Sequence, residues 1–236
     1  MKDLFGQAIL DYQTNNFPED LITETTISEK DEMRVEYLFR DWSAMPLIEK
    51  KALELAKGKI LDVGSGAGSH SLYLQNEKKL EVTAIDISPK AIKTCQLRGI
   101  KNTFVEDVLT LETEKFDTIL LLMNGTGIFG TLKNTPSFLQ KLKSLLKPTG
   151  QILIDSSDII YMFDEDEDGA LSVPANQYYG ELDFTLSYKG QTEDAFPWLY
   201  LDYNTLQNVA DDNGLTCELI QEGPHYDYLA KLKIQS

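Results

Sequence analysis

The fold of this chain is decided by a stretch of nine residues, ILDVGSGAG at 60–68. Its first half is a short apolar run that predicts a buried strand, and its second half places glycines at Gly64, Gly66 and Gly68. Glycines at a strand end let a ligand approach the backbone, and a helix that begins there offers free N–H groups. The dinucleotide fingerprint needs glycine or alanine at position 69, where this chain has Ser69. The spacing therefore disfavours a dinucleotide cofactor.

From this stretch onward, the hydrophobic pattern alternates between strands and helices. Strands are predicted at 59–63, 80–86, 102–105, 116–123 and 151–155, with helices at 69–75, 88–99 and 135–147 between them and a turn at 148–150. Strands separated by helices indicate a parallel sheet with helices on both faces. After a break, the pattern resumes with a helix at 203–212 and strands at 215–221 and 226–234.

Two segments fall outside this alternation. Residues 1–57 are predicted as an N-terminal helical cap, because apolar residues recur there at helical spacing. Residues 157–201 are predicted as an insertion, in which 181–188 alternates like a strand and 196–201 pairs with it. The remaining α/β pattern makes 58–236 one domain that carries this insertion.

Three acids follow successive predicted strands, namely Asp62, Asp86 and Asp107. The carboxyl ends of parallel strands meet at one edge of a sheet, which is where ligands bind in open α/β folds. A carboxylate in the position of Asp86 accepts hydrogen bonds from ribose hydroxyls in such sheets. Any one of these acids alone would be read as a solvated loop acid or a helix cap. In register with the glycine loop, they predict a binding site.

With these motifs the chain resembles the class I S-adenosylmethionine-dependent methyltransferases. The resemblance implies a Rossmann-like, mostly parallel seven-stranded sheet in the order 3-2-1-4-5-7-6, with strand 7 antiparallel, helices on both faces and an inserted β-hairpin. It implies S-adenosylmethionine as the cofactor and an in-line displacement of its methyl group. The cofactor-binding residues that it implies are Asp62, Gly64, Ser65, Gly66, Gly68, Asp86, Ile87, Asp107, Val108, Met123 and Asn124. Among them, Asp86 would hold the ribose, Ile87 and Asp107 with Val108 the adenine, and Met123 with Asn124 the methionine portion.

The acceptor is predicted from charge and aromatic content. The formal net charge of −16 repels phosphate backbones, so a nucleic-acid partner is unlikely on this ground. Segment 157–201 holds ten acids, one base and nine aromatic residues, and aromatic faces with carboxylates favour amines. We therefore expect a small-molecule acceptor, with an amine favoured. A protein or RNA acceptor, and a cofactor-binding module without catalytic activity, are the alternatives.

No general base stands out in the sequence. The candidates are His70, Asp155, Tyr178 and Tyr179. His70 is equally read as a packed residue in the first turn of a helix, and the tyrosines as packing of the inserted hairpin. The acidic run at 164–169 matches the opening of a calcium-binding loop, but Ala175 stands where the bidentate glutamate belongs. We therefore expect a solvated acidic loop and no metal site.

The cellular setting is predicted from what the sequence lacks. Cys95 and Cys217 are too few for a disulfide scaffold or a zinc site. The longest purely apolar run, 119–123, is far shorter than a membrane span. The first residues do not resemble a signal peptide. A cytoplasmic protein without a membrane partner is expected, and the oligomeric state is not predicted.

Overall fold

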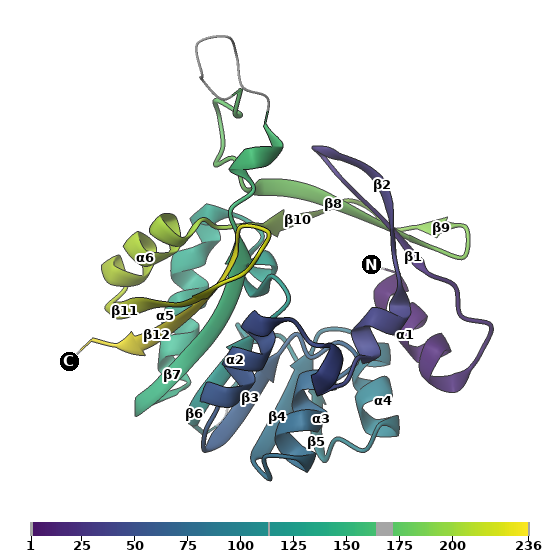
Figure 1. The fold of residues 1–236 in the computed structure, drawn as a ribbon, viewed down its shortest axis with the longest axis horizontal. Helices are drawn as coiled ribbons and strands as arrows, with labels where there is room; N and C mark the ends of the chain where they lie inside the picture. The colour runs from purple at the N-terminus through teal and green to yellow at the C-terminus, as the bar shows by residue number, and fades with distance from the viewer. Residues whose placement is uncertain (1, 113, 164–171, 236) are drawn as a thin grey trace.

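The computed structural model describes residues 2–112, 114–163 and 172–235, and a seven-stranded sheet forms its centre (Figure 1). The strands are β3 (Lys59–Val63), β4 (Glu81–Asp86), β5 (Asn102–Val105), β6 (Phe116–Leu121), β7 (Leu146–Ser157), β11 (Leu215–Glu222) and β12 (Asp227–Ile234). Their order is β5-β4-β3-β6-β7-β12-β11. Pairing is parallel from β5 to β7, whereas β12 runs antiparallel to both β7 and β11. Numbered along the sheet's own strands, this order is 3-2-1-4-5-7-6, so the predicted fold class is confirmed.

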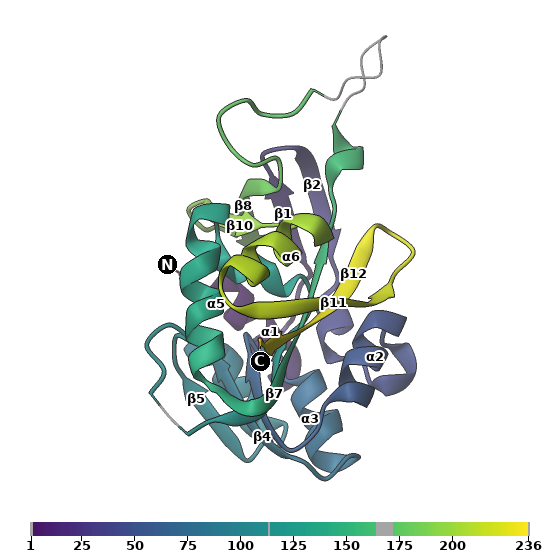
Figure 2. The ribbon, with the colours of Figure 1, turned by 90° about the vertical axis from the view of Figure 1, so that its left-hand side faces the viewer.

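Helices cover both faces of this sheet. They are α2 (Leu47–Leu55), α3 (Ser69–Asn76), α4 (Pro89–Leu97), α5 (Thr135–Ser144) and α6 (Tyr203–Asp212). Figure 2 shows α5 and α6 on one side of the sheet and α2 and α3 on the other. Separate buried apolar clusters fill the space on these two sides. Among the described residues, no helix is long and apolar enough to span a membrane.

Local rules account for where the helices begin, but not for the start of β7. The hydroxyl of Ser88 accepts the Ala91 N–H at 2.9 Å, and Pro89 occupies the first helical position of α4, as predicted. The turn predicted at 148–150 lies instead within β7, so that prediction was wrong. Leu146 already pairs with Phe116, and after a register shift the pairing of the two strands continues regularly.

The N-terminal segment is not the helical cap that its apolar spacing predicts. It contains α1 (Leu4–Thr14), β1 (Leu21–Thr25), β2 (Ser28–Met33), two 3-10 turns, η1 (Val35–Phe39) and η2 (Trp42–Ala44), and then α2. The helical prediction is therefore wrong for 21–33, where β1 and β2 form an antiparallel pair. β1 also pairs with β8, far along the chain, and sequence periodicity does not reveal such a partner.

A second sheet combines this N-terminal hairpin with the predicted insertion. Strands β8 (Glu181–Tyr188), β9 (Gln191–Thr192) and β10 (Phe196–Leu199) come from the insertion. The order is β10-β8-β1-β2, with β9 also paired to β8. The predicted pairing within the insertion is confirmed, since Phe196 lies opposite Phe184. Figure 1 shows this sheet across a gap from the carboxyl ends of β3, β4 and β6. The acidic run at 164–169 lies outside the described residues.

Candidate cofactor and acceptor site

The glycine loop joins β3 to α3 through backbone conformations that glycine adopts easily. Gly64 has a φ of 69° and Gly68 a φ of 81°, in the left-handed region. The N–H groups of Gly64 and Ser65 both donate to the Ile85 carbonyl at 3.0 Å. A Cβ atom on Gly64 would meet no described atom within 4 Å. The backbone at Gly64 is therefore open to a ligand at contact distance.

Two of the predicted acids brace this loop. Asp62 is buried, and its Oδ2 accepts the Ser71 hydroxyl at 2.6 Å. Asp86 accepts the Gly66 N–H at 2.9 Å and the Ser88 N–H at 2.8 Å, one with each oxygen. Burial raises the pKa of both carboxyls. The structure thus brings the end of β4 against the glycine loop, as the spacing predicts.

The third acid lies at the neighbouring strand end, on the surface. Asp107 is exposed, and its Oδ1 accepts the Leu109 N–H at 2.9 Å. Val108 beside it is buried, whereas Ile87, at the start of the segment after β4, is 63% exposed. An apolar side chain that is exposed here leaves surface for a flat ligand such as a nucleobase. The three acids therefore line one edge of the sheet, but only Asp107 is fully at the surface.

A tight turn after β6 forms the next part of this edge. Met123 and Asn124 have φ values of 68° and 59°, which are strained for residues with side chains. Asp155 holds the turn, because its Oδ2 accepts the Met123 N–H at 3.0 Å and its Oδ1 the Gly125 N–H at 2.8 Å. Burial raises the pKa of Asp155 to about 7. Both oxygens are engaged, so the geometry makes Asp155 a positioning residue of the turn.

The two candidate tyrosines are also engaged. The Tyr178 hydroxyl donates to Asp202 Oδ2 at 2.6 Å, and the Tyr179 hydroxyl donates to Asp158 Oδ1 at 2.8 Å. Their rings are 4.6 Å apart. Burial raises the pKa of Tyr178 to about 12 and also raises that of Tyr179. Both hydroxyls thus act as hydrogen-bond donors that tie the insertion to α6 and to the end of β7.

His70 belongs to a buried cluster that the sequence did not reveal. Its Nε2 lies 2.7 Å from Glu49 Oε2, and the other oxygen of Glu49 accepts Arg40 Nη2. Burial raises the pKa of Glu49, but the hydrogen bond with His70 and the charge of Arg40 bring it below its ordinary value. The Tyr37 ring lies over the Arg40 guanidinium at 3.9 Å. His70 is therefore bonded within this cluster.

One signal for this cluster was present in the sequence. Glu49 lies on the buried stripe of α2 together with Ala52, Leu53 and Ala56. A carboxylate within an apolar helical stripe requires a partner when the stripe is buried. Which residue supplies that partner depends on how η1 packs against α2, and Arg40 carries no periodic or motif signal of its own.

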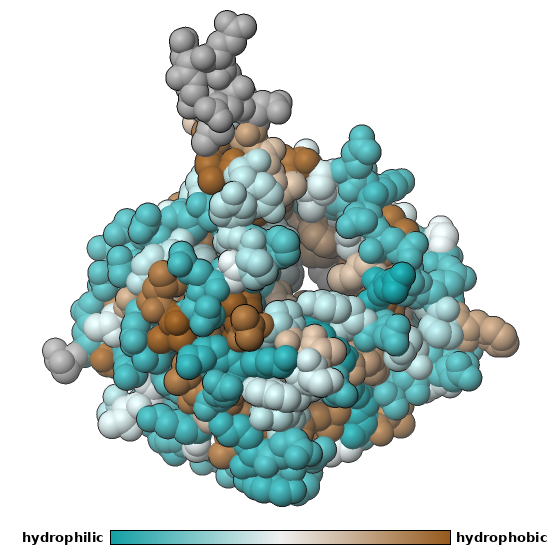
Figure 3. Space-filling model, in the orientation of Figure 1, coloured by the Kyte–Doolittle hydropathy of each residue, from teal (hydrophilic) through white to brown (hydrophobic). Residues whose placement is uncertain are grey.

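The carboxyl edge faces α1 and the second sheet across a hollow (Figure 3). On one side α1 reaches the glycine loop, since a Cβ on Gly66 would lie 3.8 Å from Phe5 Cε1. On the other side Trp198 of β10 packs on the turn after β6. A Cβ on Gly127 would lie 2.0 to 2.4 Å from the Trp198 ring, so only glycine fits there. These two contacts close the sides of the hollow.

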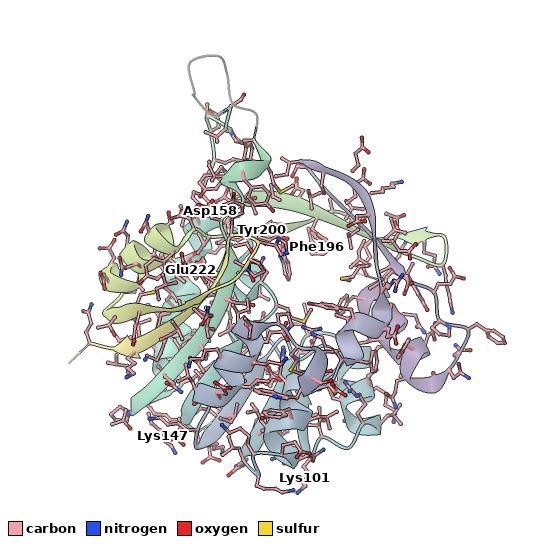
Figure 4. All side chains as sticks on the ribbon, viewed as in Figure 1. Lys101, Lys147, Asp158, Phe196, Tyr200 and Glu222 are labelled. Atoms are coloured by element: carbon pink, nitrogen blue, oxygen red, sulfur yellow. The ribbon has the colours of Figure 1, made fainter. Side chains whose placement is uncertain are left out.

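The side chains labelled in Figure 4 lie in two regions of the molecule. Phe196, Tyr200 and Asp158 lie on the side of the hollow, on or next to β10 and β7. Lys101 and Lys147 lie at the opposite end of the sheet. An acceptor that enters the hollow therefore meets aromatic rings and a carboxylate, and the labelled lysines are remote from it.

A cavity of about 570 Å³ opens at the carboxyl end of β7. Carboxylates and tyrosines make up most of its lining, namely Asp158, Asp202, Glu222, Asp227, Tyr203, Tyr226 and Tyr228. It shares Asp158 with the Tyr179 contact and includes none of the predicted cofactor residues. It is therefore separate from the predicted cofactor residues.

Similarity to known proteins points to one chemistry. A model of a methyltransferase domain matches residues 55–199, more than half of the chain. A crystal structure of an S-adenosylmethionine-dependent methyltransferase from Bacteroides fragilis, in complex with S-adenosyl-L-homocysteine, is 47% identical. Its TM-score is 0.91, and the match covers 100% of this chain and 96% of that one.

Curated relatives share a smaller part of the chain. A ubiquinone biosynthesis O-methyltransferase from Xanthomonas oryzae pv. oryzae is 27% identical over 114 residues, covering 44% of this chain and 45% of that protein. A tRNA U34 carboxymethyltransferase from Pseudoalteromonas translucida is 26% identical over 136 residues, covering 53% of this chain and 39% of that protein. The chain spans less than half the length of these relatives. The names of these relatives differ in the acceptor.

Proposed function

This chain belongs to the class I S-adenosylmethionine-dependent methyltransferase family, and we propose that it transfers a methyl group from S-adenosylmethionine to the amine of a small molecule. The observation that carries the proposal is the enclosure of the carboxyl edge. The strand ends that form the cofactor side face α1 and the second sheet across a hollow with acidic and aromatic residues at its margin.

The residues at the carboxyl ends of β3, β4, β5 and β6 fit the cofactor. The open backbone at Gly64 admits a ligand at contact distance. We assign Asp86 to the ribose hydroxyls, and Ile87, Asp107 and Val108 to the adenine. The turn at 123–124 is assigned to the methionine portion. When bound, the cofactor supplies an electrophilic methyl group on a sulfonium sulfur.

The enclosure favours a small acceptor. Trp198 seated on Gly127 and Phe5 beside Gly66 bring the second sheet and α1 close to the cofactor side. A duplex or a folded protein surface would have to displace these elements to reach the cofactor. A small molecule enters the hollow without such a change, and exclusion of water by its walls then favours the transfer step.

The cavity at the carboxyl end of β7 favours an amine. Four carboxylates and three tyrosines line the cavity at the end of β7. Carboxylates attract a cationic group, and tyrosine faces add a cation–π contribution of about 0.5–2 kcal/mol. The same carboxylates repel an anionic acceptor such as a phosphate ester or an RNA strand.

The candidate bases are all engaged in the folded protein, which also favours an amine. His70 contacts Glu49, Asp155 accepts two backbone N–H groups, and Tyr178 and Tyr179 donate to carboxylates. An ammonium group that the carboxylates attract has no lone pair, so it must first lose a proton to water, after which the neutral amine attacks. An alcohol is a far weaker acid and needs a base for the same loss of a proton. The task of this chain is then to orient the two reactants and to exclude water.

The proposal is tested by methyl transfer with the purified full chain. S-adenosylmethionine is supplied with separate panels of small amines, phenols, thiols and carboxylates, and with total transfer RNA. Release of S-adenosylhomocysteine and the mass of the methylated product are measured. Turnover of at least one amine, with none on RNA, is expected.

Two outcomes would contradict the proposal at different levels. If phenols, thiols, carboxylates or RNA are methylated and no amine is, the proposed acceptor class is wrong. Methyl transfer from S-adenosylmethionine would still hold. Failure of S-adenosylhomocysteine to bind in a calorimetric titration would overturn the cofactor assignment itself.

A further inference from the structure

Tyr37 of η1 is an exposed aromatic side chain that the fold holds in one position. The residue is 45% exposed, yet its ring lies over the Arg40 guanidinium, with 3.9 Å between Cζ and the ring centroid. The Tyr37 carbonyl also accepts Arg40 Nη1, and Arg40 is itself buried and bonded to Glu49 of α2. A side chain that is already fixed loses little conformational entropy when a ligand binds. The function proposed above assigns no role to this tyrosine.

The hydroxyl group of Tyr37 is available to a ligand. The described hydrogen bonds of this residue involve its backbone, since its N–H donates to the Arg34 carbonyl at 3.1 Å and its carbonyl accepts from Arg40. Among the described residues, none bonds to the hydroxyl. The hydroxyls of Tyr178 and Tyr179 differ in this respect, because both donate to carboxylates. A free hydroxyl oxygen accepts a hydrogen bond from an amine N–H while its own proton is donated to water.

On one side, η1 is fastened to the glycine loop. The Ser69 hydroxyl donates to the carbonyl of Leu38, the residue after Tyr37, at 2.8 Å. Ser69 directly follows Gly68, the last glycine of the loop. Figure 1 shows the chain between β2 and α2 passing the gap between the two sheets. Tyr37 is therefore next to the loop at which the proposed function places the cofactor.

On the other side, α2 packs at the strand ends that lead into the tight turn after β6. Ile48 of α2 belongs to one buried apolar cluster with Leu122 and Leu229. Leu122 directly precedes the turn at 123–124, and Leu229 lies opposite Asp155, which holds that turn. The residue after Ile48 is Glu49, which binds the guanidinium under the tyrosine ring. The ring is thus held near both the glycine loop and this turn.

Charged groups from three other elements act on the Tyr37 hydroxyl. Partial burial raises the pKa of Tyr37, the charge of Arg40 lowers it, and the carboxylates of Glu49, Asp155 and Asp227 raise it. The net pKa is above its ordinary value, so the hydroxyl is neutral at physiological pH. Asp155 holds the turn after β6, and Asp227 lines the cavity at the carboxyl end of β7. The hydroxyl is therefore within range of charges on the cofactor side and at that cavity.

We propose that the Tyr37 hydroxyl accepts a hydrogen bond from the N–H of the acceptor amine and so orients the nitrogen lone pair for methyl transfer. This inference rests on the proposed function, which supplies the amine. The amine nitrogen forms a bond to the methyl carbon, the electron pair of the breaking carbon–sulfur bond stays on sulfur, and the positive charge passes to nitrogen. An N–H on a positive nitrogen is a stronger donor, so the bond to Tyr37 is strengthened in the transition state. The methylated ammonium then loses its proton to water.

The test removes the hydroxyl of Tyr37 and keeps the ring. Tyr37→Phe retains the stacking on Arg40 and loses no described hydrogen bond, so its thermal unfolding should match that of the wild type. The probes are primary amines of the panel described above, among them ethanolamine, benzylamine and cyclohexylamine. For the amines that the wild type methylates, kcat/KM is expected to fall roughly 10- to 100-fold, as for one hydrogen bond to a charged group.

Two calorimetric titrations separate this role from a contact with the cofactor. S-adenosylhomocysteine should bind Tyr37→Phe within about threefold of the wild type, whereas the same amines should bind the S-adenosylhomocysteine complex roughly threefold to tenfold more weakly, as for a neutral hydrogen bond. The matched control is Tyr73→Phe, because the Tyr73 ring also stacks on a neighbour, Trp42, and packs against the apolar cluster of α2. None of these quantities should change in that variant.

The outcomes separate the inference from its premise. An unchanged kcat/KM in Tyr37→Phe for every methylated amine would overturn the inference. Equal weakening of S-adenosylhomocysteine and of the amines would also overturn it, because the hydroxyl would then act on the cofactor or on the fold. A loss of the same size in Tyr73→Phe would show that the effect is not specific to the hollow. Failure of the wild type to methylate any amine would instead contradict the proposed function, and the inference would fall with it.

Discussion

The two sheets of this protein are assembled in different ways. The parallel strands of the seven-stranded sheet follow one another along the chain, and short helices separate all of them except β5 and β6, among the described residues. The second sheet pairs β1 with β8, so that Ile22 lies opposite Ser187. Closing so long a loop costs entropy before any contact forms, so its strands depend on the rest of the fold. The matched methyltransferase domain covers 55–199 and excludes β1 and β2. Most of the seven-stranded sheet is thus built from neighbouring segments, whereas the second sheet joins segments that are distant in the sequence.

The largest expected loss of stability comes from Gly68, in the glycine loop of the seven-stranded sheet. Gly68→Ala puts a side chain at a φ of 81°, with its Cβ 2.3 Å from Ile100 Cδ1 and 2.9 Å from Cys95 Sγ. Strain and overpacking together should lower the free energy of unfolding by about 4 kcal/mol. Urea unfolding and S-adenosylhomocysteine titration measure this. The control is Gly99→Ala, where φ is 91° but no described atom lies within 4 Å, so only the backbone cost of about 1–2 kcal/mol remains. Equal losses in the two variants would contradict the packing argument.

The second prediction concerns Asp155, which ties β7 to the turn after β6. Its pKa is raised by burial from 3.8 to about 7, so the native state keeps a proton that the unfolded chain releases near pH 4. The stabilisation from this group is therefore full below about pH 4 and is lost as the pH rises to about 7, by about 4 kcal/mol in all. Unfolding of the wild type and Asp155→Asn at pH 5 and pH 8 should show the variant gaining stability relative to the wild type at the higher pH.

Asp117 is the control for Asp155, because its pKa is shifted in the opposite direction. The hydrogen bond from Lys147 to Asp117 lowers the pKa of that carboxyl. Its stabilising contribution is present at neutral pH and is lost as the pH falls through its lowered pKa. Asp117→Asn should therefore leave the stability difference between pH 5 and pH 8 unchanged. If both variants changed the pH dependence of the free energy of unfolding in the same way, that dependence would arise from groups other than Asp155.

The third prediction separates the two sheets directly. Trp198→Ala removes the indole that seats β10 on Gly127 and should cost about 2 kcal/mol of stability, since the ring is only partly buried. Faster hydrogen exchange is expected in β8 and β10, with S-adenosylhomocysteine affinity changed less than about threefold. Trp42→Ala is the matched variant on the other side, because Trp42 stacks on Tyr73 of α3 at 4.3 Å. Faster exchange of β8 in that variant would show that the two regions are not independent.

The smallest effect concerns a purely local feature. Ser88→Ala removes the hydroxyl that accepts the Ala91 N–H at the start of α4. A loss of about 1 kcal/mol of stability is expected, as for other N-cap serines. Ser144→Ala, at the exposed end of α5, should change stability by less than about 0.5 kcal/mol. Thermal unfolding of both variants checks this, and a larger loss at Ser144 would contradict the capping argument.

The accuracy of the sequence predictions follows the same division. Strand β5 and helix α6 were predicted with their observed bounds, because apolar pattern, caps and glycine stops all act within a few residues. The hairpin of β1 and β2 was predicted as helix, since its strand partner β8 lies far along the chain. Asp155 was a candidate base, but its contact with the turn at 123–125 depends on the packing of β6 against β7. Arg40 was missed because its partners, Tyr37 of η1 and Glu49 of α2, are set by how these two elements pack.

The sequence by itself determined the α/β alternation, the glycine loop and the row of acids at the strand ends. These features follow from hydrophobic periodicity and from the backbone freedom of glycine, both of which act over short distances. Only the tertiary structure decided which polar groups are satisfied. It joined β1 to β8, engaged Tyr178, Tyr179 and Asp155, and left the Nε of Arg40 without a described partner. Burial and hydrogen bonding arise from contacts between distant segments, and no local pattern encodes them.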